Sequence, residues 1–123
     1  MAGSSVTFTE TTSGSVKKIK AAWVSDDSAG TASGTTTYGY SGKIELLTTV
    51  PSGGGTAPTD NYDITLVDGD SVDVLAGSGA DRDTANTEQV VASSLGAVAS
   101  SKLTLSISGA GNSKQGTVYI YIR

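Results

Sequence analysis

Gly116-Thr117-Val118-Tyr119-Ile120-Tyr121-Ile122-Arg123 alternates without interruption between two sets of side chains. Val118, Ile120 and Ile122 share one parity, and Thr117, Tyr119 and Tyr121 share the other, which is the period of a β-strand. Both sets contain bulky residues, so both faces of this strand need cover. The pattern therefore predicts a central or interface strand rather than a loose terminus.

Six other segments have strand-like patterns and are separated by turn-forming residues. They are residues 5–10, 16–25, 35–50, 61–68, 88–92 and 102–108. No segment of ten residues or more has a helical period. The sequence therefore predicts an all-β fold, an antiparallel β-sandwich or barrel that is jelly-roll-like, with about seven or eight short strands and at most one short helical turn.

Three local features make this prediction more specific. In residues 35–50, Gly39 and Gly42 predict a bend or bulge that divides the segment between two sheets. The residues of one parity in that segment, expected to share one face, are Tyr38, Tyr40, Ile44, Leu46 and Val50. Residues 71–76 are expected to form a helical turn capped by Asp70, with a hairpin at 68–70 as the alternative. Residues 109–116 are expected to join segment 102–108 to the last strand as a hairpin.

The composition limits what kind of protein this is. A chain of 123 residues fits a single β domain, 1–123, in which residues 1–10 form either an N-terminal arm or the first strand. The formal charge is −4, and charged residues make up 16% of the chain against roughly 25% in average soluble domains. Charge is not concentrated as nucleic-acid binding requires, and no leader or membrane span is evident. We expect a soluble protein made in a cytoplasm, with neither nucleic acid nor membrane as partner.

Catalytic chemistry has little support in the sequence. Histidine and cysteine are absent, which removes the usual general bases and thiolate nucleophiles. The aspartate pairs at 26/27, 60/63 and 81/83 lie among turn formers, where aspartate usually binds nearby backbone. A calcium loop starting at Asp68 would need glycine and glutamate where Asp73 and Gly79 stand. We expect no catalytic residues, no cofactor, no metal and no enzyme activity.

The aromatic side chains are the remaining candidates for function. Tyrosine and tryptophan are enriched at protein interfaces, and exposed rings can also stack on sugars. A place within the chain's own core is the structural alternative for each ring. The predicted protein-interface residues are Trp23, Tyr38, Tyr40, Tyr119 and Tyr121.

A resemblance to a known family rests on the segment Ala57-Pro58-Thr59-Asp60-Asn61-Tyr62-Asp63-Ile64-Thr65-Leu66, on residues 73–77, 79–90 and 102–105, on the ending 116–123 and on residues 18–24. Through these segments most of the chain resembles small structural virion proteins of tailed bacteriophages. The resemblance implies a non-enzymatic capsid decoration (cement) protein that stabilises the phage head, made in the host cytoplasm and located on the capsid surface of the virion. Its implied partners are the major capsid protein and other copies of itself, as a homotrimer. The alternatives are a carbohydrate- or receptor-binding virion appendage and a head-tail or tail structural subunit.

Overall fold

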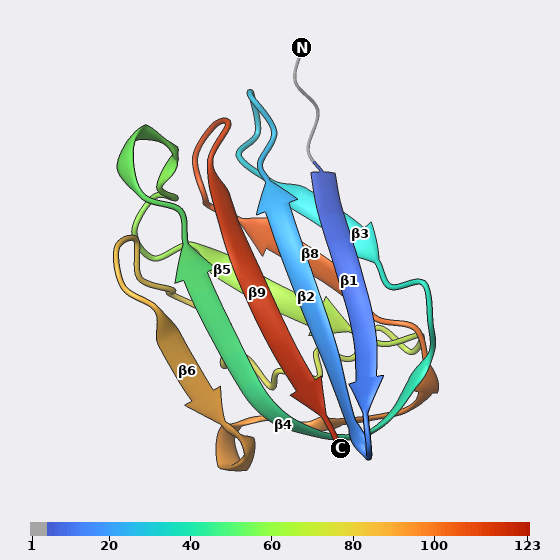
Figure 1. Ribbon diagram of the computed structural model, residues 1–123. Helices are drawn as coiled ribbons and strands as arrows, with labels where there is room; N and C mark the ends of the chain where they lie inside the picture. The colour runs from blue at the N-terminus through green and yellow to red at the C-terminus, as the bar shows by residue number, and fades with distance from the viewer. Residues whose placement is uncertain (1–4) are drawn as a thin grey trace.

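The computed structural model describes residues 5–123, which form nine strands in two packed antiparallel layers (Figure 1). The first layer, sheet A, has the order β1 (Ser5–Ser13), β2 (Val16–Val24), β9 (Gln115–Ile122), β4 (Tyr40–Pro51) and β6 (Glu88–Val91), and β7 (Ala97–Ser101) also pairs with β4. The second layer, sheet B, has the order β3 (Ala32–Thr35), β8 (Thr104–Ser108) and β5 (Asp63–Val67). Two short 3-10 segments are present, η1 (Gly54–Thr56) and η2 (Ala92–Ser94). The predicted all-β sandwich is confirmed.

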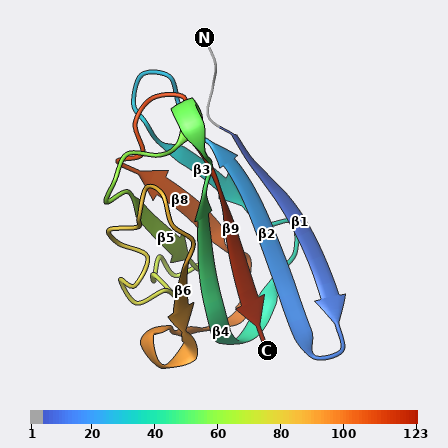
Figure 2. The same cartoon turned by 60° about the vertical axis from the view of Figure 1, so that its left-hand side comes forward.

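The strands pair in a nested order. β2 pairs with β9, β3 with β8 and β4 with β6, so each pair lies inside the previous one along the sequence. The next pair inward is reduced to two bridges, one joining Val67 to Asp73 and one joining Tyr62 to Arg82. Nested pairs that alternate between two sheets are the wrapping of a jelly roll, as the two views show (Figures 1 and 2).

The last strand occupies the middle of sheet A, as its sequence predicts. β9 lies between β2 and β4, and the side chains of Val118, Ile120 and Ile122 are fully buried against sheet B. The predicted hairpin over 109–116 is wrong, because β8 belongs to sheet B and the loop crosses from one sheet to the other. Alternation shows which residues face the core, but it does not show which strands are neighbours.

The long segment 35–50 does not contain the two strands expected, since only its first residue belongs to β3, and its parity changes at a bulge. β3 ends at Thr35 and β4 begins at Tyr40, so Tyr38 lies in the connection between the sheets. The pairing of β4 with β9 shifts between Ile44 and Leu46, and after the shift Leu47 and Thr49 are at most 1% exposed while Thr48 between them is 9% exposed. The expectation that Leu46 and Val50 share a face with Ile44 is therefore wrong, because one extra residue reverses every later side chain.

Carboxylates hold the long connection from β5 to β6. Asp63 accepts a hydrogen bond from the backbone N–H of Asp81 at 2.9 Å, and Asp60 accepts one from Thr84 at 3.2 Å. Asp73 accepts bonds from the N–H groups of residues 66 and 75, both at 3.1 Å, and from residue 77 at 3.0 Å. The loop aspartates thus bind backbone as expected, but Asp60 and Asp63 bind groups 24 and 18 positions away in the sequence instead of nearby ones. The predicted helical turn over 71–76 is wrong, because Asp73 fixes non-helical turns there instead.

Candidate protein-docking face

The outer face of sheet A carries two tyrosines on its central strand. Tyr119 and Tyr121 alternate with the buried residues of β9, so they point away from sheet B and are half-buried. In register beside Tyr121 lie Lys18 on β2 and Leu46 on β4. We define the docking face by its central outward residues, Lys18, Lys20, Leu46, Thr48, Val91, Tyr119 and Tyr121.

Lysine and aromatic side chains contact one another on this face. The Lys18 ammonium lies 5.2 Å from the ring centroid of Tyr119 and 6.0 Å from that of Tyr121. At an exposed site such a cation–π contact contributes about 0.5–1 kcal/mol and keeps the rings in place. Among residues 5–123, neither Lys18 nor Lys20 forms an ion pair. Both cations therefore stay available to carboxylates on a partner.

Apolar side chains extend the docking face toward β6, the edge strand on this side of sheet A. Val91 on β6 pairs with Leu46, and 59% of its surface is exposed, while its neighbour Val90 packs against the core. An exposed valine beside a half-buried leucine and two tyrosine rings forms a small apolar patch with polar ends. Patches of this composition are typical of interface centres.

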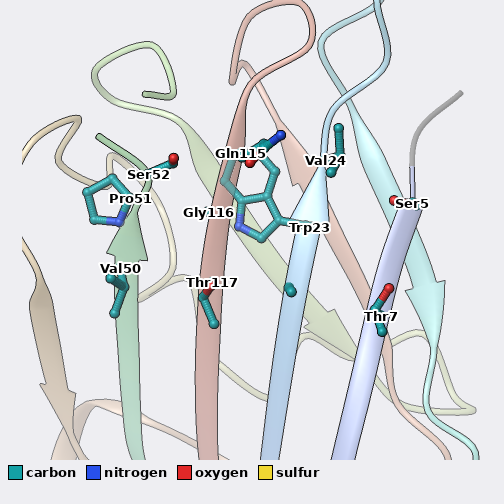
Figure 3. A pocket seen from close by; sticks show the side chains of 11 residues that line it. Ser5, Thr7, Trp23, Val24, Val50, Pro51, Ser52, Gln115, Gly116 and Thr117 are labelled. Atoms are coloured by element: carbon teal, nitrogen blue, oxygen red, sulfur yellow. The ribbon is translucent and has the colours of Figure 1, made fainter. Parts of the chain in front are cut away.

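A hollow adjoins this patch at the end of the sheet where β9 begins (Figure 3). It encloses about 310 Å³, and none of its lining side chains is charged. Small residues create it, since Ala22 and Thr117 are neighbours in the row next to Lys20 and Tyr119. The outer face thus presents a raised aromatic row beside an uncharged hollow. The lining residues are Ser5, Thr7, Ala22, Trp23, Val24, Val50, Pro51, Ser52, Gln115, Gly116 and Thr117.

The structure separates the five predicted aromatic residues into three places. Trp23 is 1% exposed and packs between the sheets, with its ring centroid 5.6 Å from that of Tyr62. Tyr40 is 7% exposed and also belongs to the core. Tyr38 is 62% exposed but lies in the connection after β3, so only Tyr119 and Tyr121 are brought together. Sequence reasoning missed Lys18, Leu46 and Val91, because their meeting depends on cross-strand register.

Burial changes the pKa of Tyr62, the core tyrosine next to Trp23. Desolvation raises the pKa of Tyr62 to about 12, although the nearby Thr49 hydroxyl and Arg82 act in the opposite direction. Neither the hydroxyl of Tyr62 nor that of Thr49 has a hydrogen-bond partner among the described protein groups. Tyr62 is therefore neutral at physiological pH.

A second, smaller hollow surrounds Glu10 at the opposite end of β1. Its volume is about 280 Å³, and Tyr38 and Lys17 contribute to its walls. Glu10 accepts hydrogen bonds from the Tyr40 hydroxyl at 2.6 Å and from the backbone N–H groups of Thr37 and Tyr38 at 3.0 and 3.2 Å. Burial acts to raise the pKa of Glu10, but these bonds outweigh it and the pKa is lowered. Burial, together with the Glu10 carboxylate, raises the pKa of Tyr40.

Glu10→Gln is expected to lower stability near neutral pH and to reduce its acid dependence. A carboxylate with a lowered folded-state pKa contributes stability above its unfolded pKa, near 4.5, and that stability is lost as the pH falls through the lower folded value. Since solvent screens this site, we expect a loss of only about 0.5–1.5 kcal/mol at pH 7. Urea denaturation between pH 7 and pH 3 measures both effects. Equal acid slopes for the wild type and the variant would contradict this role of Glu10.

Residues 5–123 contain no group of three or more histidine, cysteine, aspartate or glutamate side chains arranged to hold a metal ion. In the same residues no helix has the length and apolar character needed to cross a membrane. Comparison of the chain with protein-family models, with curated proteins and with solved structures finds no match.

Proposed function

We propose that this protein is a non-enzymatic structural protein that binds a larger protein assembly through the docking face. The observation that carries the proposal is the pair Tyr119 and Tyr121, held side by side on the central strand under Lys18. As the specific form of this function we propose a capsid decoration protein of a tailed bacteriophage, bound to the major capsid protein and stabilising the head. The motif resemblance supports that form.

The arrangement suits binding because it is already rigid. β9 is hydrogen-bonded to a strand on each side, so its outward rings are fixed without any loop having to become ordered. Preorganised aromatic side chains lose little conformational entropy when a partner covers them. Tyrosines in the centre of an interface are frequent binding hot spots. A decoration protein needs this kind of surface and no reacting groups.

The stabilising action follows from mass action. A protein that binds neighbouring subunits only when they are assembled favours the assembled shell over separated subunits. Jelly rolls occur in viral capsid and lectin domains, which is a fold-level analogy in support of a virion role. A homotrimer, as the resemblance implies, would present three docking faces to a shell, and it remains a prediction.

Tyr119→Ser and Tyr121→Ser are each expected to weaken shell binding at least about tenfold, because each removes a ring from the centre of the face. The measurement is co-sedimentation of the purified protein with expanded capsids that were assembled without it. Tyr38→Ser serves as the matched control, since it removes an exposed tyrosine that lies in the connection after β3 and outside the docking face. Thermal unfolding shows whether each variant remains folded.

Two results would overturn the proposal. Wild-type protein that does not bind such shells would remove the decoration function. Folded Tyr119→Ser and Tyr121→Ser variants that bind as the wild type does would remove the docking face. Heat resistance of shells with and without the protein gives a second readout, and no difference would remove the stabilising role.

The hollow at Glu10 favours a second candidate, a carbohydrate- or receptor-binding appendage. Tyr38 is an exposed ring beside a carboxylate, which is a combination that can stack on a sugar and accept its hydroxyl hydrogens. The buried rings of Trp23 and Tyr40 cannot stack on a sugar in this fold. A glycan array followed by Tyr38→Ala separates this candidate from capsid docking, which that substitution should leave unchanged.

A head-tail or tail subunit is a third candidate that could use the same docking face. The number of copies per particle distinguishes it, because a head decoration protein approaches the capsid protein in abundance. A reconstruction of the virion would give both position and copy number.

A further inference from the structure

The outer edge of β1 is open along the strand. β1 pairs with β2 over all nine residues in an unbroken antiparallel register. Among the described residues, its backbone forms no hydrogen bond to any element other than β2. Since antiparallel strands direct alternate N–H and C=O groups to opposite sides, roughly half of these residues present theirs at a free edge.

The other sheet edges in residues 5–123 are covered or short. The edge of β5 is covered by backbone bonds, from the N–H of Val74 to Leu66 at 2.8 Å and from the N–H of Ile64 to Gly79 at 2.8 Å. β3 and β6 each have only four residues, and β7, which pairs only with β4, has five. β1 is therefore the longest strand edge that the described chain leaves unpaired.

The first half of β1 lacks the features that usually protect an edge. The strand contains no lysine, arginine, proline or bulge, and its single charge is Glu10. That carboxylate faces inward and binds the connection after β3, which passes beside the second half of β1 (Figure 1). Residues 5–9 are left uncharged and accessible. Nothing in this window would repel an approaching strand.

The window from residue 5 to residue 9 is complementary to itself. Its outward side chains, Ser5, Thr7 and Thr9, are exposed hydroxyl residues, while Val6 and Phe8 are half-buried and pack against the core. In an antiparallel pairing centred on Thr7, Thr7 would meet Thr7, Ser5 would meet Thr9, and Val6 would meet Phe8. Hydroxyls would then pair with hydroxyls on one face and apolar side chains with apolar side chains on the other.

We propose that the edge formed by residues 5–9 binds the same edge of a second copy of this chain by two-fold antiparallel pairing. A two-fold contact is self-complementary, which favours an uncharged strand with this symmetric pattern. Cross-strand Thr–Thr and apolar pairs each contribute roughly 0.2–1 kcal/mol. Because only five residues of each chain pair, we expect a weak, concentration-dependent dimer. This pairing is independent of the docking face.

Substituting Thr7 by a positively or a negatively charged residue tests both the pairing and its register. Thr7→Lys and Thr7→Glu each place like charges opposite one another at the two-fold axis, so each variant alone should dimerise at least about tenfold more weakly. An equimolar mixture of the two should form a heterodimer, with dimerisation at least as strong as in the wild type. Sedimentation equilibrium of the full chain, up to about 1 mM, measures all three samples.

Thr65 provides the matched control. It is an exposed strand threonine on β5 of sheet B, so Thr65→Lys and Thr65→Glu should leave dimerisation unchanged. Circular dichroism shows whether the variants are folded. A wild type that stays monomeric at the highest concentration would overturn the proposal. So would a dimer or trimer that the Thr7 variants do not weaken, or a mixture that fails to recover.

Discussion

Gly116→Ala is expected to destabilise the protein by about 2–4 kcal/mol, although it adds a single methyl group. A Cβ atom at this position would lie 2.6 Å from Cζ2 of Trp23 and 2.8 Å from Cε2. Real Cβ atoms do not approach carbon atoms this closely, so the indole or the strand would have to move. The indole has little freedom, because it is 1% exposed and packed against Tyr62.

Urea denaturation followed by tryptophan fluorescence gives the measurement directly, since Trp23 is the only tryptophan in the chain. Thr117→Val is the matched control, because it changes the neighbouring residue of β9 on the outer face and should shift stability by less than about 0.5 kcal/mol. An unfolding midpoint for Gly116→Ala equal to that of the wild type would show that the indole contact does not constrain the core.

The double variant Trp23→Leu with Gly116→Ala isolates the contact between these two residues. Trp23→Leu alone leaves a cavity, and the alanine methyl group at residue 116 can occupy part of it. We expect the double variant to be at least about 1 kcal/mol more stable than the sum of the two single changes predicts. Strict additivity would mean that Gly116 is required for a reason other than the indole.

Sequence alternation predicted β9 well, because its signal is local. The two parities of residues 116–122 show which side chains face the core, and the central place of the strand follows from bulk on both faces. The role of Gly116 was not predictable, since it depends on Trp23 being the register partner across the β2–β9 ladder. Register is a property of two strands and cannot be read from either one alone.

Lys43→Met is expected to cost about 2–4 kcal/mol of stability. The Lys43 ammonium donates hydrogen bonds to three backbone carbonyl oxygens, those of Ala92 at 2.7 Å, Leu95 at 2.5 Å and Gly96 at 3.2 Å. Hydrogen bonds from a charged donor are stronger than neutral ones, and acceptors left without a partner in a partly buried site are costly. Methionine keeps most of the apolar stem but offers no donor, so the substitution isolates the loss of these bonds.

The expected fall in Tm for Lys43→Met is on the order of 10 °C. Hydrogen exchange should accelerate first in residues 92–96, where the ammonium holds the turn after β6. Lys102→Met is the control, since this lysine is exposed, and it should stay within about 0.5 kcal/mol of the wild type. A Lys43→Met variant as stable as the Lys102→Met variant would show that the turn holds without the lysine.

Other differences between the predicted and the observed structure also arise because contacts between distant strands cannot be read from one strand alone. Lys43 occurs among alternating polar residues of β4, and its acceptors lie about fifty positions away in the sequence. The bulge after Ile44 has no glycine to mark it, so the change of parity at Leu46 was not visible. β7 was missed because its alternation is weak, with Val98 as its only large apolar residue.

The binding of backbone by the aspartates was predictable in kind, but for Asp60 and Asp63 the distant position of the bound groups was not. Carboxylates among turn residues bind backbone N–H groups, and Asp60, Asp63, Asp73 and Asp83 all do so. Of the candidate site, the sequence identified Tyr119 and Tyr121 as outward residues. It could not show that Lys18, Leu46 and Val91 surround them, because those three come from β2, β4 and β6.

The place of β9 between β2 and β4 also has a consequence for synthesis. The strand that the ribosome makes last of the nine must join two strands that were made long before it and do not pair with each other. Until residues 115–122 have emerged, sheet A exists only as two separate parts with unpaired inner edges. Such edges attract chaperones and other nascent chains. A chain that lacks residues 115–122 would therefore leave these inner edges unpaired and could not close its core.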